Sequence, residues 1–129
     1  KIAIGSAVPV EKEEEYEIKG RDMLTGLPRS VGVTTNEIVK AIDSELRDIT
    51  KAIKSVLQET PPELASDIID HGIVMTGGSS LLRNIDELVR RSTGVKARVA
   101  EEPLLCVAKG TGIALEHLEV YKKSVLAKR

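Results

Sequence analysis

The strongest constraint on the fold is an alternation of helix and strand patterns in the second half of the chain. In three stretches apolar residues recur every three or four positions, which predicts amphipathic helices. In the first of these, Leu64, Ile68 and Ile69 are expected to face the core. A continuous apolar run and an alternating run predict two strands, the first covered on both faces. Because a helix joins the strands, we expect an α/β unit with a short parallel sheet. The predicted order is helix 62–71, strand 73–75, glycine turn 77–78, helix 81–93 closed by Gly94, strand 95–99 and helix 103–116.

The first third of the chain has a different pattern, that of a hairpin followed by a helix. Residues 16–19 and 30–33 alternate apolar and polar side chains around a turn that contains glycine and proline, which predicts a β-hairpin with half-buried strands. Thr34 and Glu37 have the spacing of a capping box. Behind them, apolar residues spaced by three and four predict one long amphipathic helix over residues 36–58.

Two prolines mark the boundary between these patterns. Pro61 and Pro62 end the long helix, because proline restricts the residue before it to extended conformations. We therefore expect two units, residues 1–59 with the hairpin and the long helix, and residues 60–129 with the α/β alternation.

The composition is that of a soluble globular protein. Of 129 residues, 41% are hydrophobic and 30% are charged, and with no Trp, no Phe and two Tyr the core must be aliphatic. Lys and Arg number 19 and Asp and Glu number 20, so the formal net charge is −1. A nucleic-acid-binding domain usually carries a strongly basic face and stacking aromatics, so we expect no nucleic-acid partner.

The few chemically distinctive side chains do not form a catalytic or metal-binding pattern. Cys106 is the single cysteine, and His71 and His117 lie far apart in the sequence, so neither a disulfide, a metal site nor a catalytic residue is expected. No apolar run approaches the ~18 residues of a membrane span, and no signal peptide is visible, which indicates a cytoplasmic protein. The chain begins at Lys1 without Met, so we expect a fragment of a longer polypeptide.

The strand, glycine turn and helix around the sequence TGGSS are the best candidate for a site. Gly77 and Gly78 have no Cβ, so backbone there allows close approach of a ligand. Ser79 or Ser80 is expected to cap the next helix, whose N-terminus would favour a nucleotide phosphate. The alternative is that the glycines only form a tight turn. No phosphate-binding loop of the G-x-x-x-x-G-K-[ST] type occurs.

A second pair of glycines lies inside a helical pattern. Gly110 and Gly112 each cost a helix about 1 kcal/mol relative to alanine. Either a close helix crossing or hinge between lobes, or simple helix–helix packing, would explain them.

Three stretches, GRDMLTGLPR, TPPELASDIIDHGIVMTGGSSLL and EEPLLCVAKGTGIAL, resemble the MreB-type bacterial actins, and the resemblance extends through nearly the whole chain. It covers only the C-terminal part of that family. The resemblance implies a partial actin-like ATPase fold of the α/β class. Residues 1–59 would be the small α+β outer subdomain. Residues 60–129 would be part of the ribonuclease H-like inner subdomain with the C-terminal helix.

The resemblance also implies roles for particular residues. Gly77 and Gly78 would lie against the adenosine and phosphates of a nucleotide, with Ser79 beside them where relatives have a third glycine. Lys1 would pack near the adenine. The interdomain hinge would include Ala108, Gly110 and Gly112.

The family's cofactor is ATP or ADP with Mg²⁺. The two phosphate loops and the Mg²⁺-linked aspartates of the family lie upstream of Lys1. The resemblance thus implies a weak ATPase for the full-length parent. This chain alone is expected to have no catalytic residue and no bound nucleotide.

The family polymerises in the cytoplasm at the inner membrane face, where its filaments guide cell-wall synthesis and maintain rod shape. The resemblance implies self-association, with the hairpin and the long helix contacting the inner end of the next subunit. It also implies a RodZ-like membrane adaptor and the cell-wall elongation machinery as partners, and membrane contact only through the missing N-terminal half. Two alternatives stay open: half of a kinase-type enzyme of the same superfamily, and a stand-alone dimerising interaction module.

Overall fold

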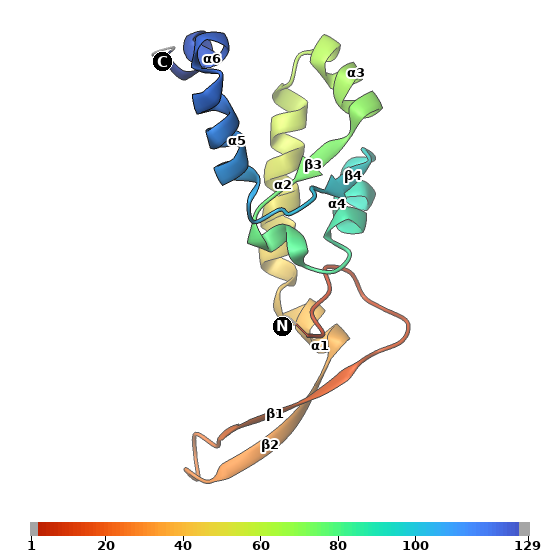
Figure 1. The fold of residues 1–129 in the computed structure, drawn as a ribbon. Coiled ribbons are helices and arrows are strands. Elements are labelled where there is room, and N and C mark those ends of the chain that lie inside the picture. Colours follow the sequence, from red (N-terminus) through yellow and green to blue (C-terminus); the bar gives the residue numbers. More distant parts are fainter. Residues whose placement is uncertain (1–2, 127–129) are drawn as a thin grey trace.

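The computed structural model describes the backbone of residues 3–126 and the side chains of residues 3–122 (Figure 1). The main body of the fold consists of helices and a two-stranded sheet. A long hairpin projects from one end of this body, and a pair of helices lies at one side. The elements are β1 (Glu15–Arg21), β2 (Pro28–Thr34), α1 (Thr35–Ala41), α2 (Asp43–Glu59), α3 (Pro62–His71), β3 (Ile73–Met75), the 3₁₀-helix η1 (Gly78–Leu81), α4 (Ile85–Thr93), β4 (Ala97–Val99), α5 (Cys106–Glu116) and α6 (Leu118–Leu126).

The predicted parallel sheet is confirmed as the pair β3–β4. Its register runs from Ile73 opposite Ala97 to Met75 opposite Val99. The expectation that β3 is covered on both faces is wrong, because Val74 remains 46% exposed. The helix that packs closely on this pair is α4, so the sheet has a covered side and an open side in the described part of the chain.

The predicted hairpin is also confirmed, but its strands are not half-buried. β1 and β2 pair antiparallel over their full length, and the hairpin projects from the body with α1 as its main contact (Figure 1). The cross-strand pairs Tyr16–Val33 and Ile18–Val31 put apolar side chains on one face. Tyr16 and Ile18 are nevertheless about half exposed, because no other described element lies closely against this face.

The capping box is confirmed, whereas the single long helix is wrong. The Glu37 N–H donates to Thr34 Oγ1 at 3.3 Å, and the Thr34 N–H donates to the Glu37 carboxylate at 2.8 Å. The helix breaks at Ile42, whose torsions are φ −109° and ψ 6°. The two pieces have different partners, because α1 packs on β2 and α2 packs on α4. Tertiary packing therefore overrides the continuous apolar pattern.

The core lies between the N-terminal segment, α2 and α4. Ala7, Leu46 and Ile85 form its buried cluster. Residues 4–8 are buried throughout, and a parallel bridge joins Ser6 to Arg83. Partly buried side chains surround the cluster: Ile42, Met75, Leu82, Leu88 and Val99. The core thus draws on both sides of the division near residue 60, and the division into units 1–59 and 60–129 stays a prediction.

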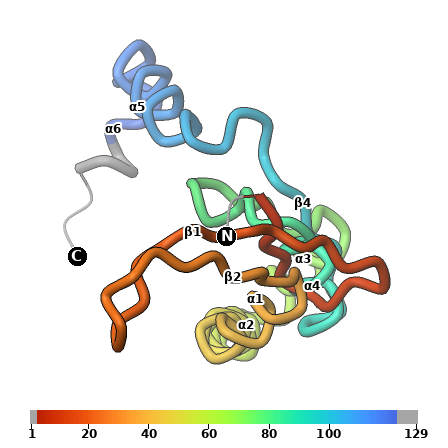
Figure 2. Tube along the Cα trace, turned by 90° about the horizontal axis from the view of Figure 1, so that it is seen from below, coloured from red at the N-terminus to blue at the C-terminus, as the bar shows by residue number. Residues whose placement is uncertain are grey.

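Several apolar side chains predicted to face a core are exposed instead. On α3, Ile68 is partly buried, whereas Leu64 is 55% and Ile69 is 65% exposed. The helices α5 and α6 stand away from the others in both views (Figures 1 and 2), and Val107 on α5 is 74% exposed. These faces find no covering element within the described residues. In that part of the chain, no helix combines the length and apolar character needed to cross a membrane.

Candidate functional site

The glycine turn after β3 has a backbone conformation that requires glycine at one position. Gly77 has φ 82° and ψ 175°, a region essentially restricted to glycine. A Cβ there would meet no atom within 4 Å, so conformation and not crowding excludes a side chain. The Gly77 N–H donates to the Pro103 carbonyl at 2.8 Å, and its own carbonyl accepts the Ser80 hydroxyl at 2.6 Å.

The segment after the turn is a single 3₁₀ turn, not the start of a long helix. The expectation that Ser79 or Ser80 caps the next helix is wrong, because α4 begins only at Ile85 after the left-handed residue Asn84. Leu82 is extended, with ψ 127°, and so separates η1 from α4. The dipole of a long helix therefore does not act at this turn, where the residues Gly78 and Ser79 are exposed.

The turn packs against the segment that leads into α5. A Cβ on Gly78 would lie 3.4 Å from Leu104 Cδ2, in van der Waals contact. This segment differs from its prediction, because α5 begins at Cys106 and not at Pro103. Residues 103–105 form a turn instead, which follows the left-handed residue Glu102 (φ 46°) and in which the Leu105 N–H donates to the Glu102 carbonyl at 2.8 Å. The glycine turn and the N-terminus of α5 are thus joined directly.

The three predicted hinge residues lie on α5 but not on one face. Ala108 and Gly112 are four residues apart and share a face, whereas Gly110 lies on the other side of the helix. A Cβ on either glycine would meet no atom within 4 Å. Packing among the described residues therefore does not require these glycines. Their role as a hinge stays a prediction.

The charged side chains near the turn pair with each other and form no metal site. Lys109 makes an ion pair with Glu102, and both side chains are more than half exposed. The Cys106 thiol lies 3.6 Å from the carbonyls of Glu101 and Glu102. Among the described residues, no group of three His, Cys, Asp or Glu side chains could hold a metal ion. Lys1, predicted near the adenine, lies outside the described residues.

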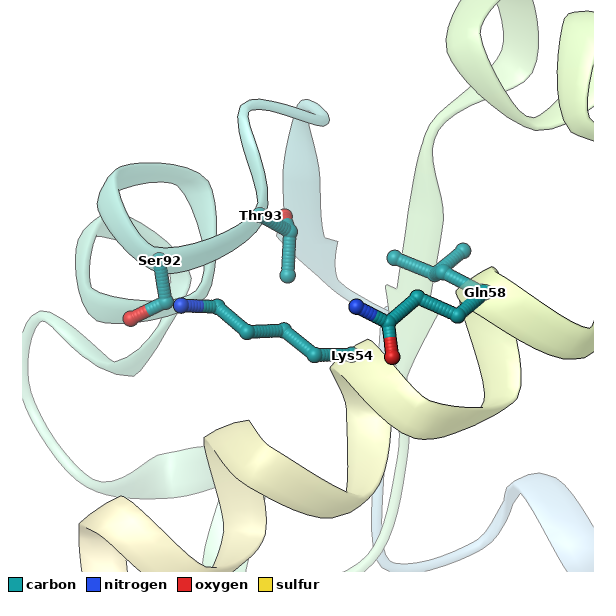
Figure 3. A pocket seen from close by; sticks show the side chains of 5 residues that line it. Lys54, Gln58, Ser92 and Thr93 are labelled. Atoms are coloured by element: carbon teal, nitrogen blue, oxygen red, sulfur yellow. The ribbon is translucent and has the colours of Figure 1, made fainter.

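Two hollows in the surface are lined by other elements. One, of about 300 Å³, lies between the C-terminal ends of α2 and α4, and Figure 3 shows the Lys54 side chain extending across it toward Ser92. The other, of about 370 Å³, lies on the polar face of the hairpin. Their linings are Lys54, Leu57, Gln58, Ser92 and Thr93 for the first, and Glu15, Glu17, Ser30 and Gly32 for the second. Neither contains a residue predicted to bind a ligand.

The hairpin loop contains an ordered carboxylate that the sequence interpretation missed. Asp22 accepts hydrogen bonds from the backbone N–H groups of Thr25 and Leu24 and from Arg29. These bonds lower the pKa of Asp22 from 3.8 to about 2, and that from Thr25 has the largest effect. Asp side chains commonly accept bonds from backbone N–H groups of a turn, and Gly26 marks the same loop, so Asp22 and Gly26 together could have located it. The loop holds Met23 and Leu24 almost fully exposed, at 97% and 96%.

A parallel strand pair with a glycine turn, joined to a separate hairpin, is part of an actin-like fold. The solved structure "Crystal structure of MreB5 of Spiroplasma citri bound to ADP" matches with a TM-score of 0.84 and 35% identity, over 96% of this chain and 37% of that chain. The form of MreB5 bound to AMPPNP matches with a TM-score of 0.83 and 34% identity, over the same shares of the two chains. The partial actin-like fold expected from the sequence is confirmed.

A family model described as MreB/Mbl protein matches residues 1–123, and the chain belongs to the MreB/Mbl family. It is 47% identical to the cell shape-determining protein Mbl of Bacillus cereus, over 98% of this chain and 38% of that protein. It is 46% identical to the cell shape-determining protein MreB of Escherichia coli, over 94% of this chain and 35% of that protein. The chain thus spans well under half the length of these relatives. The family assignment supports the cytoskeletal interpretation and not the kinase-type or stand-alone alternatives.

Proposed function

We propose that this chain is part of a bacterial actin-like filament protein that binds ATP and maintains rod shape by guiding cell-wall synthesis. The observation that carries the proposal is the match over 96% of the chain to MreB5, which was solved with ADP and with AMPPNP. The curated relatives are named as cell shape-determining proteins, and all of those cited are bacterial.

The nucleotide site would include the glycine turn. Gly77 and Gly78 would lie against the adenosine and phosphates, with Ser79 beside them and Lys1 near the adenine. The empty space around the Cβ position of Gly77 and the exposure of Gly78 and Ser79 fit such a ligand. The Mg²⁺-linked aspartates of the family would lie upstream of Lys1 in a full-length parent. That parent would be a weak ATPase, and this chain alone would bind no nucleotide.

Movement between lobes would use the start and middle of α5. Its predicted hinge residues are Ala108, Gly110 and Gly112. The hydrogen bond from the Gly77 N–H to the Pro103 carbonyl, just ahead of α5, supports a link between nucleotide and hinge. Residues 1–59 would be the outer subdomain and residues 60–129 part of the inner one.

Self-association would use the hairpin and the α1–α2 helices against the inner end of the next subunit. Two surfaces at opposite ends of the fold, the hairpin tip and α3, support this (Figure 1). The hairpin tip exposes Met23 and Leu24 next to the basic Arg21 and Arg29. At the other end, α3 exposes apolar and acidic side chains together. Those α3 residues are Glu63, Leu64, Asp67, Ile69 and Asp70.

The remaining partners follow from the family. We place the protein in the cytoplasm at the inner membrane face, with a RodZ-like adaptor and the cell-wall elongation machinery as partners and no nucleic acid. Membrane contact would come through the N-terminal half of a longer polypeptide.

The test is nucleotide binding and sedimentation of the complete gene product. Gly78→Leu adds a side chain beside Leu104 and should weaken ATP binding by at least about tenfold. Gly20→Leu is the matched control, because it makes the same exchange in β1 at a position where a Cβ meets no atom within 4 Å. Unchanged ATP affinity in Gly78→Leu would contradict the adenosine-site assignment. Failure of the unmodified protein to sediment with ATP would contradict the filament proposal.

A further inference from the structure

One ion pair joins the base of the hairpin to the loop behind the glycine turn. Arg83 Nη1 donates to both carboxylate oxygens of Glu14, each at 3.0 Å, across 69 positions of sequence. Glu14 directly precedes β1, and Arg83 follows η1 by two residues. The hydrogen bond from Arg83, and then its charge, lower the pKa of the Glu14 carboxyl, so the pair is formed with both groups charged at neutral pH.

At the base of the hairpin, Glu14 is hydrogen-bonded to Thr35, the residue that follows the second strand. The Thr35 N–H donates to the Glu14 carbonyl at 3.0 Å, and the Thr35 hydroxyl lies within hydrogen-bond distance of the same residue's carbonyl and N–H. Thr35 is fully buried and follows β2 directly. A displacement of Glu14 therefore moves the base of β1 and the base of β2 together.

On the turn side, Arg83 belongs to a rigid junction. The Ala7 N–H donates to the Arg83 carbonyl at 2.8 Å, and Asn84 Nδ2 donates to Ser6 Oγ at 3.0 Å. Ser6 is fully buried and Ala7 is 3% exposed. Packing of this density transmits a displacement and does not absorb it.

Between this junction and the glycines lies the short helix η1. η1 is one 3₁₀ turn, and its flanking backbone bonds, from Ser80 to Gly77 and from Leu82 to Ser79, are long at 3.3 and 3.2 Å. Short 3₁₀ segments often mark functional hinges. A ligand that reorders the turn would shift Arg83, and Arg83 would carry Glu14 and the hairpin with it.

We propose that Glu14 and Arg83 are positioning residues that couple nucleotide at the glycine turn to the orientation of the hairpin, and hence to self-association. This inference rests on the proposed function. The charge of Glu14 depends on Arg83 for most of its compensation. Glu14 is surrounded in sequence by glutamates, and Lys12 is the nearby cation on its own segment. Without Arg83 these like charges would repel one another.

The experiment measures, in the complete gene product, the ATP dissociation constant and the critical concentration for assembly with and without ATP. The variants are Glu14→Arg, Arg83→Glu and the double exchange. Glu11→Arg, which makes the same charge change three residues away, is the matched control. Each single exchange should leave ATP affinity within about twofold and reduce the ATP-dependent change in critical concentration by about two- to fivefold, the size expected for one exposed ion pair. The double exchange should restore it.

A second readout follows the hairpin base itself. In the unmodified protein, ATP should change the hydrogen-exchange rate of the Thr35 amide, and in the single exchanges it should not. The inference is overturned if the single exchanges respond to ATP as the unmodified protein does, or if the double exchange fails to restore the response. An unmodified protein that binds no ATP or does not assemble would instead overturn the proposed function, and the inference with it.

Discussion

Asn36 and Val10, 26 positions apart, exchange two hydrogen bonds. The Val10 N–H donates to Asn36 Oδ1 at 3.0 Å, and Asn36 Nδ2 donates to the Val10 carbonyl at 3.1 Å. The amide also donates to the Glu13 carboxylate at 2.7 Å. One side chain at the start of α1 therefore fixes the N-terminal segment before it enters the hairpin.

Replacing this amide by a carboxylate should destabilise the chain. In Asn36→Asp, the Nδ2 donor becomes a charged acceptor facing the Val10 carbonyl and the Glu13 carboxylate. Leaving a hydrogen-bonding group without its partner costs about 1–3 kcal/mol. Urea denaturation at neutral pH should therefore show the free energy of unfolding of Asn36→Asp lowered by this amount. Gln58→Glu, the same amide-to-acid change at an exposed position of α2, should stay within about 0.5 kcal/mol. Equal losses in both variants would show that Asn36 does not hold this junction.

The order of the hairpin loop should depend on pH through Asp22. Its pKa is lowered from 3.8 to about 2 in the folded loop, so the loop favours the charged carboxylate. The charged Asp22 carboxylate therefore stabilises the folded loop fully above about pH 4, and this stabilisation is lost as the pH falls toward 2. Amide signals of Leu24 and Thr25, which donate to this carboxylate, should report the change by NMR.

Asp22→Asn should abolish the pH dependence of these two signals between pH 4 and 2. Asp48→Asn on α2 is the control, because it removes a carboxylate from an exposed helix far along the chain from the loop. If the Leu24 and Thr25 signals of Asp22→Asn shift between pH 4 and 2 as they do in the unmodified chain, another group titrates in the loop.

The elements that could be predicted are those whose signals are local. The capping box at Thr34, the glycine C-cap at Gly94 with φ 76°, and the strand 73–75 all depend on residues a few positions apart. The glycine turn was identified for the same reason, because Gly77 lies directly behind a strand.

The features that could not be predicted depend on distant contacts. Residues 4–8 are buried through the bridge between Ser6 and Arg83 and through the packing of Ala7 with Leu46 and Ile85, which no local pattern reveals. The break at Ile42 follows from the different packing partners of α1 and α2. The exposure of Leu64 and Ile69 arises because the apolar pattern anticipates a covering element that the described residues do not supply. Likewise, no spacing rule links Glu14 to Arg83.

Gly72 should tolerate no side chain. It has φ 78° and ψ −176°, and a Cβ would lie 2.7 Å from the Lys96 carbonyl oxygen, which already accepts the Ile73 N–H. Gly72→Ala must displace that carbonyl and weaken the first bond between β3 and β4. Backbone strain alone should lower the unfolding free energy by about 1–3 kcal/mol, and the clash adds to it. Gly20→Ala, with open space at its Cβ, should not destabilise. A melting temperature equal to that of the unmodified chain would contradict the observed turn geometry.

The glycines of α5 should behave in the opposite way. Gly110 and Gly112 are helical, and a Cβ on either meets no atom within 4 Å. Gly110→Ala and Gly112→Ala should therefore each stabilise the 129-residue chain by about 0.5–1 kcal/mol, measured by urea unfolding with helix content as the probe. Ala52→Gly on α2 should cost a similar amount and calibrates the scale. If the hinge proposal is correct, the same alanine variants should impair ATP-dependent assembly of the complete gene product, because another segment approaches α5 there. Destabilisation already in the 129-residue chain would mean that a second copy packs on this helix, and the glycines would then serve self-association and not a hinge.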